Sequence, residues 1–388
     1  MISLLFISST GILNPKTGYQ IRVYNLISQL SKRGFNIIVL QPEEKICYEN
    51  ETEKVKLSVE RFKNFTPPNL NDLNIFLFLK LCKILKEKNL SGIQVEGCSG
   101  VLASRIATRL FGKDVKIVYD AHNVEGDRVR YIKDLPLIKR VFAPLVIPLV
   151  EKMAVKIADH IISVSHKDKE LFTKRYDIKP NKITVIPSGA NLVNLRSLEI
   201  RSNARKRFGI KNDDIIIVFH GTYTYQPNKE AIQLIMNFIA PKIMENYSNV
   251  KFIVAGKDVP KFEKGNLKFV GFVDDLYSLL SASDIAIVPI LRGGGTRLKI
   301  MDYMAVGLPI VTTKKGIEGI EAESGKHVII VDDVNEEFIK AIKYLIDNEQ
   351  ERKRIGANAR RLAEEEYDWG SKIGEKLDGL YRKLIEKK

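Results

Sequence analysis

Short apolar runs alternate with amphipathic segments along most of this chain of 388 residues. The runs LLFISS (residues 4–9) and NIIVLQP (residues 36–42) are rich in branched apolar residues and have the length of buried strands. Between them, residues 19–32 place apolar side chains about three positions apart, as one face of a helix requires, before Gly34 ends the pattern. Strands that alternate with helices in this way predict a parallel, doubly wound sheet of the α/β class.

The same plan occurs in both halves of the chain. Further strands are predicted at residues 92–97, 116–122, 160–165 and 182–189, and then at 215–221, 250–256, 267–272, 284–290 and 309–313. Helices are predicted near 73–88, 100–111, 136–158 and 166–175, from Lys229 onward, and over 336–345, 350–366 and 371–388. A polar, charged stretch at 191–209 is the best candidate for a linker. We therefore expect two domains, residues 1–190 and 191–370, because the chain is too long for one small core.

Composition narrows the function classes only in part. The formal net charge is +15, and residues 1–190 hold most of the excess, with 30 Lys and Arg against 19 Asp and Glu. Nucleic acid, an anionic membrane surface and a phosphorylated small molecule are the partners that such a charge admits. Three cysteines and five scattered histidines show no metal-binding spacing, and the first residues lack a signal-peptide pattern. We therefore expect a cytoplasmic protein with reduced thiols and no metal site.

A strand, a glycine-rich loop and a helix are predicted in succession by the segment DIAIVPILRGGGTRLKIMDYM, which begins at residue 284. Gly293, Gly294 and Gly295 allow a ligand to approach the backbone without interference from a Cβ atom. Thr296 is expected to cap the helix that follows. The N–H groups and the dipole at such a helix start favour an anion, and phosphate is the usual one.

Two cations and a carboxylate follow the loop. Arg297 and Lys299 fall in the first helical turn, where positive charge is unfavourable to the helix itself, and this placement indicates an anionic ligand. Asp302 shares roughly one face with Lys299 and could accept hydrogen bonds from ribose hydroxyls. The alternative is a tight turn with a solvated basic end, which would not account for a phosphate cradle, cations and a carboxylate falling together.

The segment resembles the donor-binding segment of retaining glycosyltransferases of family 4 (glycosyltransferase group 1) in its order P-x-x-x-G-G-G-T-R-x-K-x-x-D-x-M-A-x-G-x-P-I-V-x-T, followed by G-x-E-G. The resemblance implies the GT-B fold, in which two Rossmann-like domains face a central cleft. It implies that residues 1–190 bind the acceptor, that 191–370 bind the donor, and that the final helix, 371–388, crosses back to the first domain. Many members carry two glutamates eight residues apart across this helix. Here Asp302 stands at the second position and Gly294 at the first.

The resemblance also assigns roles outside this segment. Gly18 matches a glycine that lets the first loop close on the donor diphosphate. His122 matches the cleft histidine that contacts the donor sugar near its reacting carbon. Gly221 and Asn228 match the loop beside the donor phosphates, and Glu318 of the G-x-E-G motif is expected to hold the donor sugar.

The implied reaction is the transfer of a sugar from a nucleotide-diphosphate sugar to a glycan or lipid-linked acceptor, with retention of configuration and without a metal or another cofactor. Arg297, Lys299 and the backbone at 294–296 would stabilise the departing diphosphate. Glu125 and Arg128 are candidates for contact with the acceptor. Rival functions are a nucleotide-sugar 2-epimerase of the same fold, for which no acid–base cluster stands out, and a basic nucleic-acid-binding protein. No aromatic-basic stacking motif supports the latter, so we expect no nucleic-acid partner.

Residues 128–157 combine a long apolar run with seven Lys and Arg against two Asp and Glu. Charged residues and two prolines interrupt the run, so it does not read as a transmembrane span. It could lie on an anionic membrane as a basic amphipathic segment, which would suit a lipid-linked acceptor and peripheral attachment to the inner face of the cytoplasmic membrane. An ordinary buried helix with snorkelling lysines explains the pattern equally well.

Overall fold

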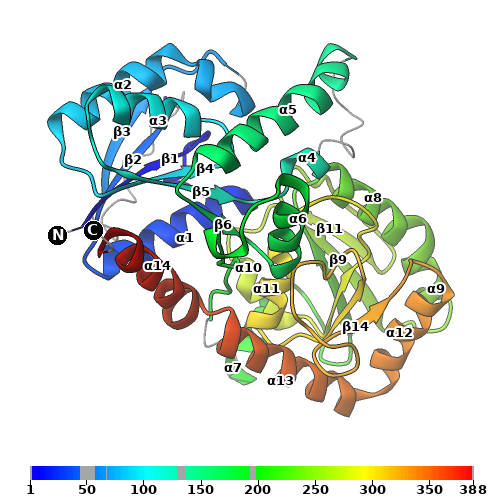
Figure 1. Cartoon of the computed structure of the whole chain (residues 1–388). Helices are drawn as coiled ribbons and strands as arrows, with labels where there is room; N and C mark the ends of the chain where they lie inside the picture. The colour runs from blue at the N-terminus through cyan, green and yellow to red at the C-terminus, as the bar shows by residue number, and fades with distance from the viewer. Residues whose placement is uncertain (1, 44–56, 67, 129–136, 193–197, 387–388) are drawn as a thin grey trace. The chain divides into compact units, whose positions relative to one another are not determined.

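A computed structural model describes the chain except residues 1, 44–56, 67, 129–136, 193–197 and 387–388 (Figure 1). The chain forms two compact units, one of Met1–Ser188 with Trp369–Lys388 and the other of Gly189–Asp368. The sequence-based prediction places both boundaries two residues later, after residues 190 and 370. Each unit holds a seven-stranded sheet flanked by helices.

The first unit has a fully parallel sheet in the order β3-β2-β1-β4-β5-β6-β7. Its strands are β1 (Ser3–Ile7), β2 (Asn36–Pro42), β3 (Leu57–Phe62), β4 (Gly92–Glu96), β5 (Lys116–Ala121), β6 (His160–Ser163) and β7 (Ile183–Val185). The strand order reverses beside β1, which pairs with both β2 and β4. Ligands of such sheets bind outside the carboxyl ends of the strands at this switch point, so the residues that follow β1, β4 and β5 are the ones placed for function.

Helices cover both faces of the first sheet. They are α1 (Gly18–Lys32), α2 (Ile75–Glu87), α3 (Val101–Leu110), the short α4 (Glu125–Arg128), α5 (Leu137–Ile157), α6 (His166–Tyr176) and α14 (Gly374–Glu386). One core joins Leu4 and Phe6 of β1 to apolar side chains of α1 and α14, and the other joins Leu5 and Ile7 to α2, α3 and α5. Alternate residues of β1 therefore serve opposite cores, as the pleat of a strand requires.

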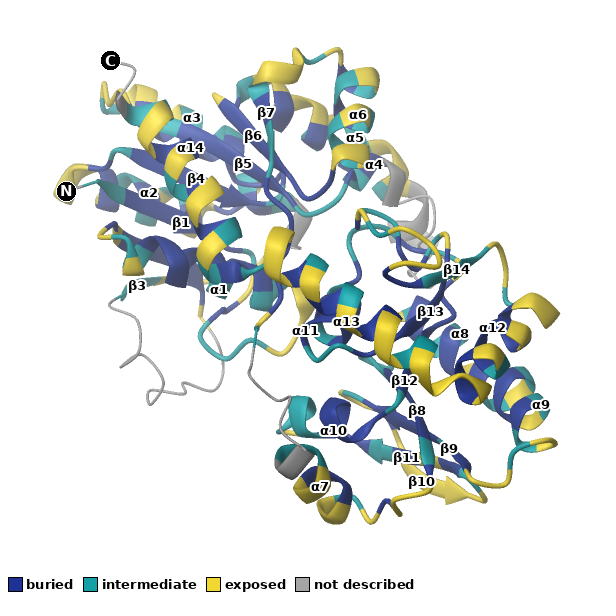
Figure 2. Cartoon of the chain, turned by 90° about the horizontal axis from the view of Figure 1, so that it is seen from below, coloured by how far each residue is buried: buried dark blue, intermediate teal, exposed yellow. Residues whose placement is uncertain are grey.

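The second unit repeats the plan in the order β10-β11-β9-β8-β12-β13-β14. Its strands are β8 (Ile215–His220), β9 (Val250–Ala255), β10 (Lys261–Lys264), β11 (Leu267–Gly271), β12 (Ile285–Val288), β13 (Ile310–Thr313) and β14 (Ile329–Val331). Only β10, at one edge, runs antiparallel to its neighbour. Its helices are α7 (Leu198–Arg207), α8 (Gln226–Leu234), α9 (Ala240–Met244), α10 (Leu276–Ala282), α11 (Leu298–Ala305), α12 (Glu336–Asp347) and α13 (Glu349–Glu366). Figure 2 shows the central strands of both sheets as buried, whereas β10 is exposed.

The α/β fold class is confirmed in both units, but the predicted linker at 191–209 is wrong. Residues 198–207 form helix α7 of the second unit. Arg201 and Arg205 of this helix both form ion pairs with Asp284, at 2.6 and 3.3 Å. Arg205 also donates to the backbone oxygen of Ala282, 3.0 Å away, at the end of α10. Arg201 and Arg205 therefore make long-range contacts that hold this helix against α10.

Candidate functional site

The glycine-rich loop after β12 leads into α11. Gly293 and Gly295 have φ angles of 112° and 74°, the left-handed region that glycine tolerates best. The predicted cap at Thr296 is wrong, because α11 begins at Leu298 and Arg297 occupies the N-cap position. The Arg297 guanidinium donates to the carbonyl oxygen of Gly294, 2.7 Å away, and to that of Gly295. These bonds fasten the loop, and the buried Thr296 hydroxyl has no hydrogen-bond partner among the described residues.

Lys299, on the first turn of α11, reaches the loop that follows β8. Its Nζ donates to Oδ1 of Asn228 at 2.7 Å and lies 3.9 Å from the centre of the Phe219 ring. The Asn228 amide in turn donates to the backbone oxygen of Thr222 at 2.9 Å. A Cβ atom on Gly221 would lie 2.7 Å from Asn228 Nδ2 and 2.8 Å from Lys299 Nζ. The structure thus brings together three residues that the sequence singled out, and a side chain at Gly221 would collide with the other two.

The charge of Lys299 is the unusual feature of this cluster. Burial, and secondarily the nearby Arg297, hold the pKa of Lys299 well below its usual range, while Asp302 acts in the opposite direction. Lys299 and Arg297 are only 8% and 6% exposed. No carboxylate of the described residues lies within salt-bridge distance of Lys299, whose hydrogen bond goes to a neutral amide. Two adjacent buried basic side chains favour an anionic ligand, because an anion beside Lys299 would act against the lowering of its pKa by burial.

The glycine-rich loop and the β8–α8 loop also meet at Gly293. A Cβ atom there would lie 2.9 Å from the Tyr225 hydroxyl, 3.1 Å from Pro227 Cγ and 3.4 Å from Arg297 Nη2. Gly293 therefore permits the close approach of two loops that lie almost 70 residues apart in the sequence. Tyr225 and Pro227 were not predicted as site residues, although their loop was.

Asp302 lies one turn beyond Lys299 on α11. Its Oδ1 accepts a hydrogen bond from the Tyr277 hydroxyl at 2.8 Å, and its Oδ2 is 3.5 Å from Nε2 of His220. Burial raises the pKa of Asp302 to about 7. Burial and the neighbouring Lys299 lower the pKa of His220 to about 3, so this imidazole is neutral at physiological pH. Sequence reasoning missed Tyr277 and His220, and only the position of His220 at the end of an apolar strand could have indicated it.

Glu318 lies in the segment after β13 and forms an ion pair with Lys315, three residues earlier. The side chain of Glu318 is 18% exposed. Its predicted contact with the donor sugar stays a prediction.

The first unit places His122 in a second polar cluster, directly after β5. His122 Nε2 is 2.8 Å from Oε2 of Glu96, the last residue of β4, and 3.9 Å from Oδ2 of Asp120. Its ring stacks on Tyr19 of α1 with the ring centres 4.6 Å apart. Tyr19 donates to the backbone oxygen of Glu96 at 3.3 Å. The histidine is therefore held in one orientation by two neighbouring strand ends and one helix.

Buried polar side chains form hydrogen bonds with Asp120 and Glu96, the two carboxylates beside this histidine. Arg22 donates to both carboxylate oxygens of Asp120, at 3.0 and 3.2 Å. Gln94 donates to Oε1 of Glu96 at 2.6 Å and accepts a hydrogen bond from Tyr381 of α14. Burial, and secondarily Asp120, raise the pKa of Glu96.

Glu96, Asp120 and His122 offer ligand atoms within 4.8 Å of one another, and Arg22 already supplies a positive charge beside Asp120. Sequence reasoning missed Glu96 and Arg22. A charged residue inside an otherwise apolar strand was the available signal for Glu96.

The remaining predicted residues lie around the same strand ends. Gly18 is the first residue of α1, whose N-terminus is closed by a capping box between Thr17 and Gln20. Glu125 is the first residue of α4, and its N–H donates to Oε1 of the buried Glu151 on α5 at 2.7 Å. The side chain of Arg128 lies outside the described residues, so its predicted acceptor contact stays a prediction.

Comparison with known proteins identifies the class that this fold and these clusters define. Residues 17–194 match the Glycosyltransferase Family 4 model, and residues 214–348 match Glycosyl transferases group 1. The chain is 24% identical over 359 residues to the Escherichia coli UDP-Gal:alpha-D-GlcNAc-diphosphoundecaprenol alpha-1,3-galactosyltransferase, covering 84% of this chain and 87% of that protein. It is 26% identical over 350 residues to the capsular polysaccharide biosynthesis glycosyltransferase CapM of Staphylococcus aureus, covering 82% and 84%.

The fold is similar to that of Anabaena HepE, solved in complex with UDP-glucose, with a TM-score of 0.75, 17% identity and coverage of 99% and 100% of the two chains. These matches define a glycosyltransferase with the GT-B fold. The chain belongs to glycosyltransferase group 1, family 4. The matches to known proteins do not favour a nucleotide-sugar 2-epimerase or a nucleic-acid-binding protein.

Proposed function

We propose that this glycosyltransferase acts with retention of configuration and without an essential metal, and that the second unit binds its nucleotide-diphosphate sugar. The observation that carries the proposal is the buried pair Arg297 and Lys299 beside a glycine-rich loop. Such a reaction needs charge stabilisation for a departing diphosphate, which fixed cations and backbone N–H groups can supply. A diphosphate beside Lys299 would raise the lysine pKa that burial now lowers, so binding and protonation of the amine favour each other.

Neighbouring residues are assigned to the other parts of the donor and to the acceptor. Gly221 and Asn228 shape the wall beside the diphosphate, and the backbone at 293–296 contributes donors to it. Asp302, oriented by Tyr277, accepts hydrogen bonds from the ribose hydroxyls. His122 and Glu318 hold the transferred sugar, Gly18 lets the first loop close on the diphosphate, and Glu125 and Arg128 contact the acceptor, as the family resemblance implies.

A thermal-shift panel tests the donor assignment. UDP, GDP, ADP and CMP are compared, each with its common sugar conjugates, with and without EDTA, because a ligand of the folded state raises the melting temperature by mass action. We expect one nucleoside diphosphate to give a selective shift that EDTA leaves unchanged. Lys299→Met should lose this shift, whereas the control Lys353→Met, an exposed α13 lysine paired with Glu349, should keep it. A shift of equal size in Lys299→Met would remove the basis of the proposal.

We further propose a lipid-linked acceptor and peripheral attachment to the cytoplasmic membrane. The E. coli relative is named for transfer to a diphosphoundecaprenol-linked sugar, which supports this acceptor class. None of the helices in the described part of the chain is long and apolar enough to cross a membrane. Radioactive sugar transfer to a polyprenyl-diphosphate sugar, compared with a water-soluble glycan, is the direct test, and exclusive use of the soluble glycan would overturn this part.

A further inference from the structure

The first unit carries an unusual amount of exposed apolar surface. Eleven of the sixteen large apolar residues that are exposed in the described part of the chain lie between Phe65 and Met153. Most of them belong to α2, α3 and α5, which pack against one face of the first sheet and contact one another in the order α2, α3, α5. Soluble proteins seldom leave such a patch uncovered unless something binds it.

Helix α5 shows the pattern most clearly. Phe142, Leu145, Leu149 and Met153 follow one another at spacings of three and four residues, so they form one stripe along the helix. They are 59%, 63%, 62% and 42% exposed, and Lys156 lies on the same stripe. The opposite side of α5 is the one that packs inward, with Ile147, Glu151, Ala154 and Val155 all buried. The helix therefore has two apolar sides, of which only one is used by the fold.

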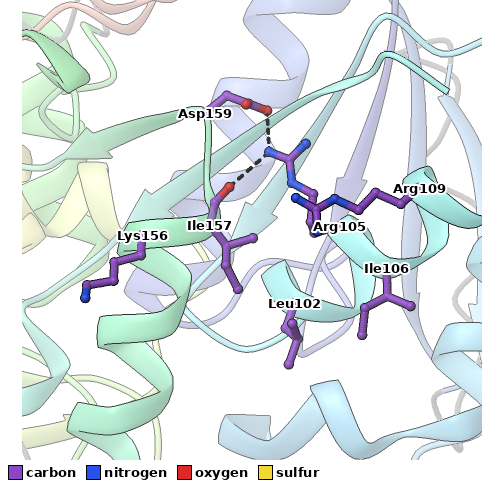
Figure 3. Close-up of a pocket in the computed structure, with 7 residues that line it drawn as sticks. All are labelled: Leu102, Arg105, Ile106, Arg109, Lys156, Ile157 and Asp159. Atoms are coloured by element: carbon purple, nitrogen blue, oxygen red, sulfur yellow. Dashed lines mark hydrogen bonds and ion pairs between the residues drawn. The ribbon is translucent and has the colours of Figure 1, made fainter. Parts of the chain in front are cut away.

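The charges on this layer favour an anionic partner. The described parts of α2, α3 and α5 carry seven Lys and Arg against two Asp and Glu, and one of those acids, Glu151, is buried. A pocket of about 470 Å³ lies where α3 meets the end of α5 (Figure 3). Its lining combines apolar side chains with three cations and one acid, namely Leu102, Ile106, Arg105, Arg109, Lys156 and Asp159. Arg105 is tied to Asp159 at 2.8 Å, which leaves Arg109 and Lys156 to determine the charge of the rim.

We propose that this face of α2, α3 and α5 docks on an anionic lipid bilayer, with the α3–α5 pocket receiving a lipid phosphate. The inference rests on the proposed lipid-linked acceptor, which must be met at a membrane. Apolar side chains of the α5 stripe would enter the acyl boundary, while Arg109 and Lys156 would contact phosphate oxygens. The segment 128–157 that the sequence indicated therefore covers only part of this face, because five of its exposed apolar residues belong to α2 and α3 and four to α5.

Vesicle flotation tests the docking face with the full chain. Wild type should bind vesicles of phosphatidylcholine with phosphatidylglycerol at low salt and bind poorly to phosphatidylcholine alone. Arg109→Gln and Lys156→Gln should each weaken binding about fivefold, and the Leu145→Ser, Leu149→Ser double variant at least as much. Two matched controls in the second unit, Phe272→Ser (54% exposed) and Lys353→Gln, should bind as wild type does.

Two results would overturn the proposal: wild type that fails to bind the anionic vesicles, or surface variants that bind as tightly as wild type. A third is a stable dimer in sedimentation equilibrium that the Leu145→Ser, Leu149→Ser variant abolishes, since the face would then belong to a second copy of the chain. The thermal shift with the nucleoside diphosphate is measured on every variant. A preserved shift with lost vesicle binding, or the reverse, separates failure of the docking face from failure of the donor assignment.

Discussion

The ionised carboxylate of Asp302 lowers the free energy of unfolding, and the Asp302→Asn variant should remove this destabilisation. Burial raises the pKa of this carboxyl from 3.8 to about 7, although the hydrogen bond from Tyr277 and the nearby Lys299 act in the opposite direction. A group whose pKa is higher in the folded protein than in the unfolded chain stabilises the fold while it is protonated. This contribution is therefore fully present below about pH 4 and is lost as the pH rises through 7.

The pKa shift sets the size of the effect. At about 1.4 kcal/mol per pKa unit, the lost stabilisation is at most about 4 kcal/mol at pH 8 and about 1.5 kcal/mol at pH 5. Asparagine keeps an acceptor oxygen for the Tyr277 hydroxyl, 2.8 Å from Oδ1, and removes the charge. Relative to wild type, the free energy of unfolding of the variant should therefore rise, by an amount that grows between pH 5 and pH 8.

Urea unfolding of both proteins between pH 5 and pH 8 measures this gain. The exposed carboxylate Asp332, paired with Lys314 on the surface, provides the control, because Asp332→Asn should change the unfolding free energy by less than about 0.5 kcal/mol at any pH. A gain for Asp302→Asn that is constant with pH, or a loss of stability at pH 8, would show that the Asp302 carboxylate does not destabilise the fold. In the same variant, the nucleoside diphosphate that wild type selects should bind about tenfold more weakly or worse, since the ribose loses a charged acceptor.

Three further predictions concern the two polar clusters. Arg297→Ala and Lys299→Ala should each lower turnover by at least about tenfold, because one charge-stabilising contact contributes several kcal/mol to a transition state; near-normal turnover in both would contradict their role. Calorimetry in buffers of different ionisation enthalpy should show proton uptake when a nucleoside diphosphate binds, because the anion raises the pKa of Lys299 that burial lowers. Equal uptake in Lys299→Met would assign the proton elsewhere. Glu151→Gln should destabilise the loop after His122 by about 1–3 kcal/mol, because the carboxylate accepts bonds from the N–H groups of Glu125 and Gly126 at 2.7 and 2.9 Å. Thermal unfolding and the KM for acceptor check this, and an unchanged KM would limit Glu151 to a structural role.

Local pattern was enough to predict most of the fold. Alternating apolar runs and amphipathic segments gave the main strands of both sheets, and the glycine-rich motif led to Gly293, Arg297 and Lys299. The edge strands β3, β10 and β14 were not predicted, because they are short and include exposed or half-exposed residues. Helix α7 was read as a linker because its arginines find their partner, Asp284, about 80 residues later.

The polar clusters show a clearer limit. Lys299 and Asn228 are 71 residues apart, Arg22 and Asp120 are 98 apart, and Tyr381 and Gln94 are 287 apart. No local signal specifies such pairings, because each depends on which strands become neighbours in the sheet. The prediction of where α11 begins was wrong for a different reason. A threonine before a helix is normally a good cap, but here Arg297 binds the loop carbonyls and the helix begins later.

The chain order of the first unit has a consequence for how the protein is made. Its last twenty residues, Trp369–Lys388, follow the whole of the second unit in the sequence. They carry Trp369, Leu377 and Tyr381 into the core that β1 and α1 begin. On the ribosome, the second unit can therefore finish folding while one side of the first sheet still faces water. A stop codon at residue 369 would leave every donor-site residue intact and yet produce a chain with an open apolar face, prone to chaperone capture and aggregation.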